Sequence, residues 1–115
     1  MIYAIDFDGT IVEDKYPEIG ELYYLAEKFI RKLKANGDTF ILHTCRHGER
    51  LEEALNFLQQ HGLEPDYINE NVPELIAKYG DCRKIYADVY IDDHNSGGVR
   101  WPWETLRLEK NHGTD

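Results

Sequence analysis

Segments typical of strands alternate with segments typical of helices along the chain, and this alternation constrains the fold more than any other feature. Strands are expected in four apolar, β-branched and aromatic stretches: residues 1–6, 39–44, 66–68 and 88–92. Helices are expected where apolar residues recur every three or four positions. In the first helix these are Leu22, Leu25, Ala26, Phe29, Ile30 and Leu33. Strands joined by helices form parallel sheets, so the chain is predicted to be α/β, a three-layer sandwich.

Turn-forming residues set the ends of several predicted elements. Residues 7–19 carry Gly, Pro and several charges, which favours a loop or a small flap. Asn36-Gly37 ends the first helix, and His61-Gly62 ends the second, whose apolar positions are Leu51, Ala54, Leu55 and Leu58. A last short helix is expected at residues 101–108, opened by a proline.

The third predicted helix spans residues 72–79. Asn71 and Glu74 have the spacing of a capping box, and Pro73 suits the first turn of a helix. Gly80 is expected to end the helix because it can adopt the left-handed backbone conformation.

Length and charge restrict the class of protein. The 115 residues are 42% hydrophobic, which predicts one globular domain over 1–115. With 13 Lys and Arg against 22 Asp and Glu, the net charge is −9. Such a surface repels nucleic acid and anionic membranes, so neither is expected as a partner. No apolar run approaches the ~20 residues of a membrane span, and the start does not resemble a signal peptide, so we expect a cytoplasmic protein.

The stretch IDFDGT places two carboxylates, Asp6 and Asp8, directly after the first predicted strand. Side chains alternate along a strand, so both can point the same way from its carboxyl end. At ~4 Å two like charges repel by several kcal/mol at an effective dielectric constant of about 20. A bound divalent cation would remove that repulsion, and carboxylate oxygens suit Mg²⁺.

Other strand ends carry further polar residues. Asp92 and Asp93 end the last predicted strand, and Thr44 ends the second. The carboxyl ends of parallel strands form the ligand-binding edge of such sheets. The Thr44 hydroxyl, the backbone amides after it and the Arg46 guanidinium could hold an anion there.

Taken together, DFDGTIV, the Thr that closes the second strand, and KIYADVYIDD resemble the haloacid dehalogenase superfamily of phosphatases. The motifs occur in that family's order and cover residues 5–93. The pattern is most similar to small capless phosphatases found in capsule-biosynthesis loci. The resemblance implies a Rossmann-like parallel sheet, no cap domain and a phosphomonoester hydrolase that requires Mg²⁺.

The resemblance also implies roles for the four acidic residues. Asp6 matches the nucleophile that becomes a transient aspartyl phosphate, and Asp8 matches the general acid and base, whose carbonyl also binds Mg²⁺. Asp93 matches a metal ligand, with Asp92 beside it. The expected metal ligands are therefore Asp6, Asp8, Asp92 and Asp93.

Two further residues match the family's phosphate-binding groups, Thr44 by its hydroxyl and Lys84 by its ammonium. Eight positions separate Lys84 from Asp92, about 26 Å if this segment is one extended strand. Lys84 can reach the site only if residues 84–87 run back across the sheet. Lys78 and Arg46 are the alternative sources of the positive charge.

The intervals between the motifs are too short for a cap domain. An open site suits a phosphorylated small molecule or an exposed phosphoester, or is covered by a second copy of the chain. Two other functions remain as alternatives. A phosphoacceptor receiver-like signalling domain shares the fold type and an aspartyl phosphate but has its motifs in a different order. A catalytically silent phosphate-binding module would not need both Asp6 and Asp8.

Overall fold

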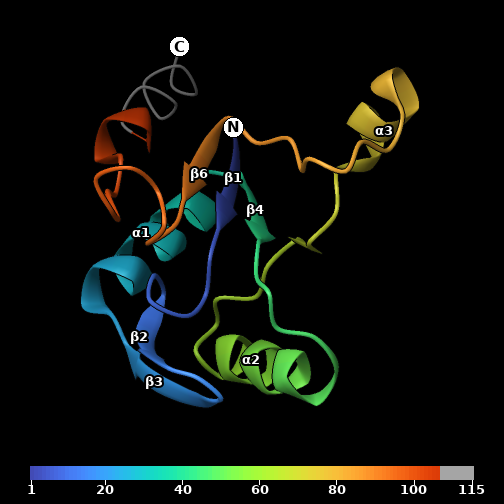
Figure 1. Ribbon diagram of the computed structural model, residues 1–115. Coiled ribbons are helices and arrows are strands. Elements are labelled where there is room, and N and C mark those ends of the chain that lie inside the picture. The colour runs from blue at the N-terminus through green and yellow to red at the C-terminus, as the bar shows by residue number, and fades with distance from the viewer. Residues whose placement is uncertain (107–115) are drawn as a thin grey trace.

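The computed structural model describes residues 1–106, in which a four-stranded parallel sheet is the central element (Figure 1). Its strand order is β5-β4-β1-β6, with bounds Tyr67–Ile68, Thr39–Leu42, Ile2–Ile5 and Val89–Ile91. The helices are α1 (Tyr24–Ala35), α2 (Gly48–Gln60) and α3 (Pro73–Tyr79). The predicted α/β class with a parallel sheet is therefore confirmed.

Strand β1 lies between β4 and β6, and its register brings three strand ends together. Ala4 of β1 is level with Ile41 of β4 and with Tyr90 of β6. The ladder continues past the end of β1, because the Asp6 N–H donates to the Ile91 carbonyl at 2.9 Å. The residues that follow β1, β4 and β6 therefore meet at one edge of the sheet.

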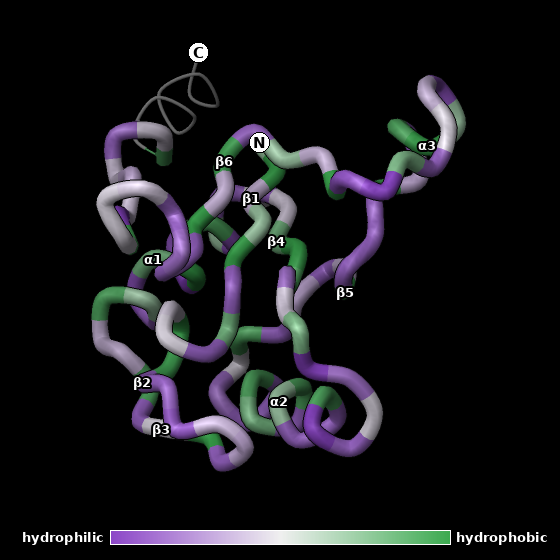
Figure 2. Tube along the Cα trace, in the orientation of Figure 1, coloured by the Kyte–Doolittle hydropathy of each residue, from purple (hydrophilic) through white to green (hydrophobic). Residues whose placement is uncertain are grey.

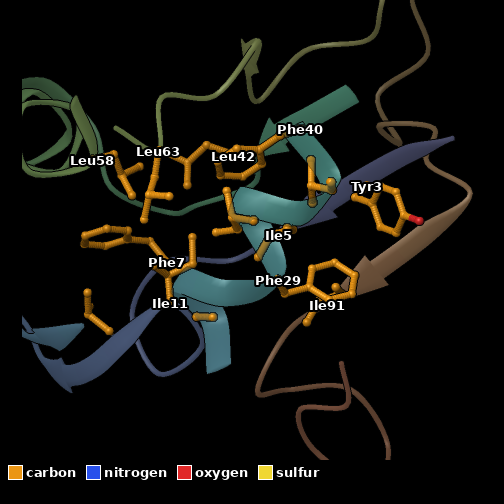
Figure 3. Close-up of a cluster of buried hydrophobic side chains, with 14 of the residues drawn as sticks. Tyr3, Ile5, Phe7, Ile11, Phe29, Phe40, Leu42, Leu58, Leu63 and Ile91 are labelled. Atoms are coloured by element: carbon orange, nitrogen blue, oxygen red, sulfur yellow. The ribbon is translucent and has the colours of Figure 1, made fainter. Parts of the chain in front are cut away.

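One face of this sheet packs on α1 and forms the hydrophobic core (Figure 3). Tyr3, Ile5 and Phe7 alternate with residues of the other face and are fully buried, as is Phe29 of α1. The ring of Phe29 lies 5.6 Å from that of Tyr3 and 5.2 Å from that of Trp101. Replacing an aromatic residue in such a core by Ala typically costs about 3–5 kcal/mol.

The other sheet face has a looser cover. Ala4 and Ile41 are buried there, whereas Tyr90 is half-buried. Helix α3 has no fully buried residue and projects from the body of the protein (Figure 1). The tube in Figure 2 shows hydrophobic residues in β1 and β4 and mostly hydrophilic ones along the hairpin at the carboxyl end of the sheet.

That hairpin is the predicted flap, and it is longer than predicted. Strands β2 (Val12–Lys15) and β3 (Glu18–Leu22) pair in antiparallel fashion, and Val12 is opposite Leu22. The prediction that Leu22 begins the first helix is therefore wrong. Leu25, predicted on the apolar face of that helix, lies in the first turn of α1 but is 51% exposed.

The capping box predicted at the third helix is wrong as well. Val72 is the N-cap of α3, with no side-chain cap hydrogen bond. Asn71 is buried and instead joins the segment after α3: its Nδ2 donates to the Cys82 carbonyl at 3.0 Å, and its Oδ1 accepts from the Tyr86 N–H at 2.7 Å. The side chain thus holds the loop that leads into β6.

Other predicted boundaries agree within one or two residues. The helix ends at Asn36-Gly37, His61-Gly62 and Gly80 are confirmed, and Gly37, Gly62 and Gly80 have φ angles of 81°, 71° and 86°. Of the last predicted helix, residues 103–106 form a helical turn, and 107–108 lie outside the described residues. Within residues 1–106, no helix has the length and apolar character needed to cross a membrane.

Candidate functional site

Three carboxylates meet at the carboxyl ends of β1 and β6. One oxygen each from Asp6, Asp92 and Asp93 lies within 4.8 Å of the other two. These side chains are brought together by the pairing of two parallel strands that are far apart in the sequence. The structure therefore assembles the acidic group that the two sequence motifs predicted, except for Asp8.

Thr10 connects two of these acids from a fully buried position. Its hydroxyl accepts a hydrogen bond from the Asp93 N–H at 2.9 Å and donates to Asp6 Oδ2 at 3.1 Å. Gly9, with φ 84°, makes the close approach possible, since a Cβ at that position would collide with the Asp93 carboxylate. The turn after β1 is thus shaped to bring Asp6 and Asp93 together.

The electrostatics of this cluster are unfavourable without a cation. Burial, then the charge of Asp92, then a hydrogen bond with the Asp93 side chain raise the pKa of Asp6 from 3.8 to about 7. The Thr10 hydroxyl opposes this rise. In addition, Asp93 Oδ1 is buried and has no hydrogen-bond partner among residues 1–106, and a buried oxygen of this kind costs free energy unless it binds something.

These observations fit a hard divalent cation. Mg²⁺ prefers carboxylate oxygens, usually takes one or two of them directly, and keeps water or phosphate oxygens on its other positions. The three clustered acids offer such oxygens, and the unpartnered Asp93 Oδ1 would gain a ligand. The side chains of Asp6, Asp92 and Asp93 could hold the ion, and the expected role of the Asp8 carbonyl as a ligand stays a prediction.

The Asp8 carboxylate lies outside this cluster and pairs with Arg46. Arg46 Nε lies 2.8 Å from Asp8 Oδ2, and Arg46 Nη2 lies 2.8 Å from Asp8 Oδ1. The Arg46 side chain is 1% exposed, and it also donates to the carbonyls of Glu18 in the flap and Arg50 in α2. Its pKa is raised chiefly by the hydrogen bond to Asp8. Arg46 therefore holds Asp8 and has little capacity left to bind a substrate anion.

Thr44 lies beside the acids in one depression at this edge of the sheet, called here the acidic hollow. Asp6, Asp8, Thr44 and Asp92 are among the residues that line its volume of about 690 Å³. The Thr44 hydroxyl oxygen accepts from the Arg46 N–H at 3.1 Å. No acceptor for the hydroxyl proton occurs within residues 1–106, so Thr44 can donate to a bound anion.

Asn69 positions Thr44, a role that was not predicted from the sequence. Asn69 Oδ1 accepts from the Thr44 N–H and its Nδ2 donates to the Thr44 carbonyl, both at 2.9 Å. The Asn69 N–H also donates to the Leu42 carbonyl, so the amide side chain continues the β4–β5 ladder beyond its end. With φ 52°, Asn69 adopts a left-handed conformation that Asn tolerates better than most residues. An Asn directly after a short edge strand was the available signal.

The chain does reverse before β6, as a role for Lys84 requires. The Tyr90 hydroxyl donates to the Ile85 carbonyl at 2.6 Å and accepts from the Ala87 N–H at 3.2 Å, which folds residues 85–87 back over Tyr90. The Lys84 ammonium lies 5.7 Å from the centre of the Tyr90 ring.

Lys84 lines a second depression of about 490 Å³, called here the basic hollow, which shares Asp92 with the acidic hollow. No ion pair joins Lys84 to an acid within residues 1–106. Lys78 lies on the projecting α3 with its ammonium over the Tyr79 ring, and it lines neither hollow.

Neither a protein-family model nor a curated protein matches this chain. A solved structure, that of a conserved protein coded by a locus from Bacteroides thetaiotaomicron, is 38% identical in sequence. The match has a TM-score of 0.81 and covers 96% of this chain and 91% of the other. The chain belongs to the same family as that protein. Family membership supports the fold described above and by itself assigns no activity.

Proposed function

We propose that this protein is a Mg²⁺-dependent phosphomonoester hydrolase of the haloacid dehalogenase type, a single Rossmann-like domain without a cap. The observation that carries the proposal is the meeting of Asp6, Asp92 and Asp93 at the ends of two adjacent parallel strands, with an unpartnered buried oxygen on Asp93. Beside this cluster, Thr44 offers a free hydroxyl proton at the end of the next strand. Acids and an anion-binding group at one sheet edge are what hydrolysis of a phosphoester requires.

In the proposed reaction Asp6 attacks phosphorus and forms an aspartyl phosphate, while the bond from phosphorus to the leaving oxygen breaks. Water then attacks the same phosphorus and releases phosphate and free Asp6. Bound Mg²⁺ would neutralise negative charge on the phosphoryl oxygens. Thr10 orients the Asp6 carboxylate for the attack by its hydrogen bond to Oδ2.

Asp8 is proposed to act first as the general acid, which gives a proton to the leaving oxygen, and then as the general base, which takes a proton from the attacking water. In the described structure both Asp8 oxygens accept from Arg46, an arrangement that suits the carboxylate before it takes a proton from water. Proton delivery to the leaving group requires the side chain to turn away from Arg46. Arg46 is therefore proposed to set the resting orientation of Asp8 instead of binding the substrate.

Thr44 and Lys84 are proposed to bind the phosphoryl group. The Thr44 hydroxyl donates from the acidic hollow itself, and Lys84 approaches from the adjoining basic hollow. A preorganised donor of this kind typically contributes about 10²–10³ in turnover.

The test is hydrolysis of p-nitrophenyl phosphate and a panel of phosphorylated small molecules with Mg²⁺, using Asp6→Asn and Asp14→Asn. Asp14 also lines the acidic hollow but lies on the flap outside the carboxylate cluster, so it is the matched control. Asp6→Asn should abolish release of phosphate, and Asp14→Asn should retain it. Residual turnover of Asp6→Asn within tenfold of the wild type would refute covalent catalysis by Asp6.

A further inference from the structure

The basic hollow contains a positive charge that the proposed reaction does not use, that of Arg83. Lys84, which the reaction does use, also lines it, together with His43 and Tyr90. Asp92, one of the three clustered acids, lines both hollows, so the basic hollow adjoins the carboxylate cluster at this residue. A substrate bound at the acids and long enough to pass Asp92 would reach it.

Arg83 differs from the other arginines that the structure describes. Arg31, Arg46, Arg50 and Arg100 each pair with a carboxylate at 2.8–3.1 Å. Arg83 has no such partner within residues 1–106, although the chain has 22 acidic residues against 13 basic ones. An arginine without a carboxylate in so acidic a protein has its full set of N–H donors available to a ligand.

The side chains around Arg83 also lack anionic partners. Lys84 contacts the Tyr90 ring only as a cation over its face, and the His43 ring lies 6.4 Å from that of Tyr90 without a side-chain hydrogen bond in the described residues. The Tyr90 hydroxyl is itself hydrogen-bonded to Ile85 and Ala87. The basic hollow thus presents hydrogen-bond donors beside an aromatic ring.

We propose that the basic hollow is a subsite for a second anionic group of the substrate, bound chiefly by the Arg83 guanidinium. The preferred substrates would then be phosphomonoesters that carry a carboxylate or a second phosphate close to the phosphoryl group that is hydrolysed. This inference rests on the proposed function for the position of the phosphoryl group. A planar guanidinium favours a carboxylate because two parallel N–H···O bonds can form.

Binding of non-hydrolysable phosphonates tests the subsite without requiring turnover. Phosphonoacetate, 3-phosphonopropionate and 4-phosphonobutyrate are compared by calorimetry, in Mg²⁺, with ethyl-, propyl- and butylphosphonate. At least one carboxylated compound should bind about tenfold more tightly than its alkyl match, the factor that 1.4 kcal/mol represents. If no carboxylated compound gains more than threefold, the subsite is refuted.

Variants assign that preference to Arg83. Arg83→Gln should bring the ratio of the affinity for a carboxylated phosphonate to that for its alkyl match close to one. Arg83→Lys should keep part of the preference for the carboxylated compound, because the positive charge remains although the planar guanidinium is lost. Arg100→Gln is the matched control, since Arg100 is also exposed but lines neither hollow. A ratio equal in wild type and Arg83→Gln would overturn the assignment, as would an equal loss in Arg100→Gln.

The two proposals fail in different ways. If neither p-nitrophenyl phosphate nor any member of the phosphoester panel is hydrolysed, but the carboxylated phosphonates still bind more tightly in an Arg83-dependent way, the proposed function is refuted and the anion subsite stands. If hydrolysis occurs and the carboxylated phosphonates bind no more tightly than their alkyl matches, the proposed reaction stands and the subsite is refuted.

Discussion

Replacing Asp6 by Asn should change how the stability of the metal-free protein depends on pH. The folded-state pKa of Asp6 is about 7, above its ordinary 3.8. Between these two values the folded protein binds more protons at Asp6 than the unfolded chain does. The contribution of Asp6 to the free energy of unfolding is therefore complete below about pH 4 and is lost as the pH rises toward 7.

The size of this effect follows from the shift. At about 1.4 kcal/mol for each unit of pKa, the full change would be about 4 kcal/mol. Asp6 is only half-buried, so solvent screening reduces the expected change to about 1–2 kcal/mol. Asn does not titrate, so the Asp6→Asn protein lacks this loss. Its free energy of unfolding relative to the wild type should rise by that amount between pH 4.5 and pH 8.

Urea unfolding in EDTA at pH 4.5 and pH 8 measures this difference, with Asp14→Asn as the control for a carboxylate outside the cluster. Mg²⁺ should reverse the order at pH 8. At 100 times its dissociation constant, an ion that binds only the folded wild type contributes about 2.7 kcal/mol. If the free energies of unfolding of Asp6→Asn and the wild type differ by the same amount at both pH values, the repulsion among the three clustered carboxylates is refuted.

Four further changes test other parts of the site. Asp93→Ala should remove the rise in melting temperature that millimolar Mg²⁺ gives the wild type, as thermal unfolding with and without EDTA will show. Lys84→Met should lower kcat by about 10²–10³, whereas wild-type turnover would exclude Lys84 from phosphate binding. Arg46→Met should lower the free energy of unfolding by about 3 kcal/mol, because it leaves the largely buried Asp8 carboxylate without its cationic partner. An unchanged urea midpoint would contradict this. Asn69→Gly permits the same backbone conformation but removes both bonds to the Thr44 peptide, so it should raise the inhibition constant of inorganic phosphate without weakening Mg²⁺ binding.

Much of the fold and part of the site could be predicted because they depend on short-range patterns. Apolar runs and turn residues indicated the parallel strands, and the rule that strand ends share one edge placed Asp6 near Asp92 and Asp93. The first helix was predicted to begin too early because Leu22 and Leu25 happen to continue its spacing, although Leu22 belongs to the flap. Local spacing does not distinguish such a coincidence from a true helical face.

The remaining parts of the site depend on single contacts between distant side chains and backbone groups. The Arg46 pair with Asp8 spans 38 positions, and the bonds from Asn69 to Thr44 span 25. Asn71 was predicted to cap a helix because its local spacing allowed it, but its partners lie 11 and 15 positions further along. Contacts of this kind leave no periodic signal in a single sequence, so they could be found only from the structure.

The hydrogen bond between the Asp93 N–H and Thr10 has a consequence for how the protein is made. It joins residues 83 positions apart, and β6, which carries Asp93 into place, is the last strand of the parallel sheet in the described residues. During synthesis Asp6 leaves the ribosome long before Asp92 and Asp93, so a growing chain does not yet have the three-acid cluster. A nascent chain that ends before β6 should therefore show no response to Mg²⁺, and the response should arise only when the last strand has emerged and paired with β1. Metal binding would then mark the completion of folding on the ribosome.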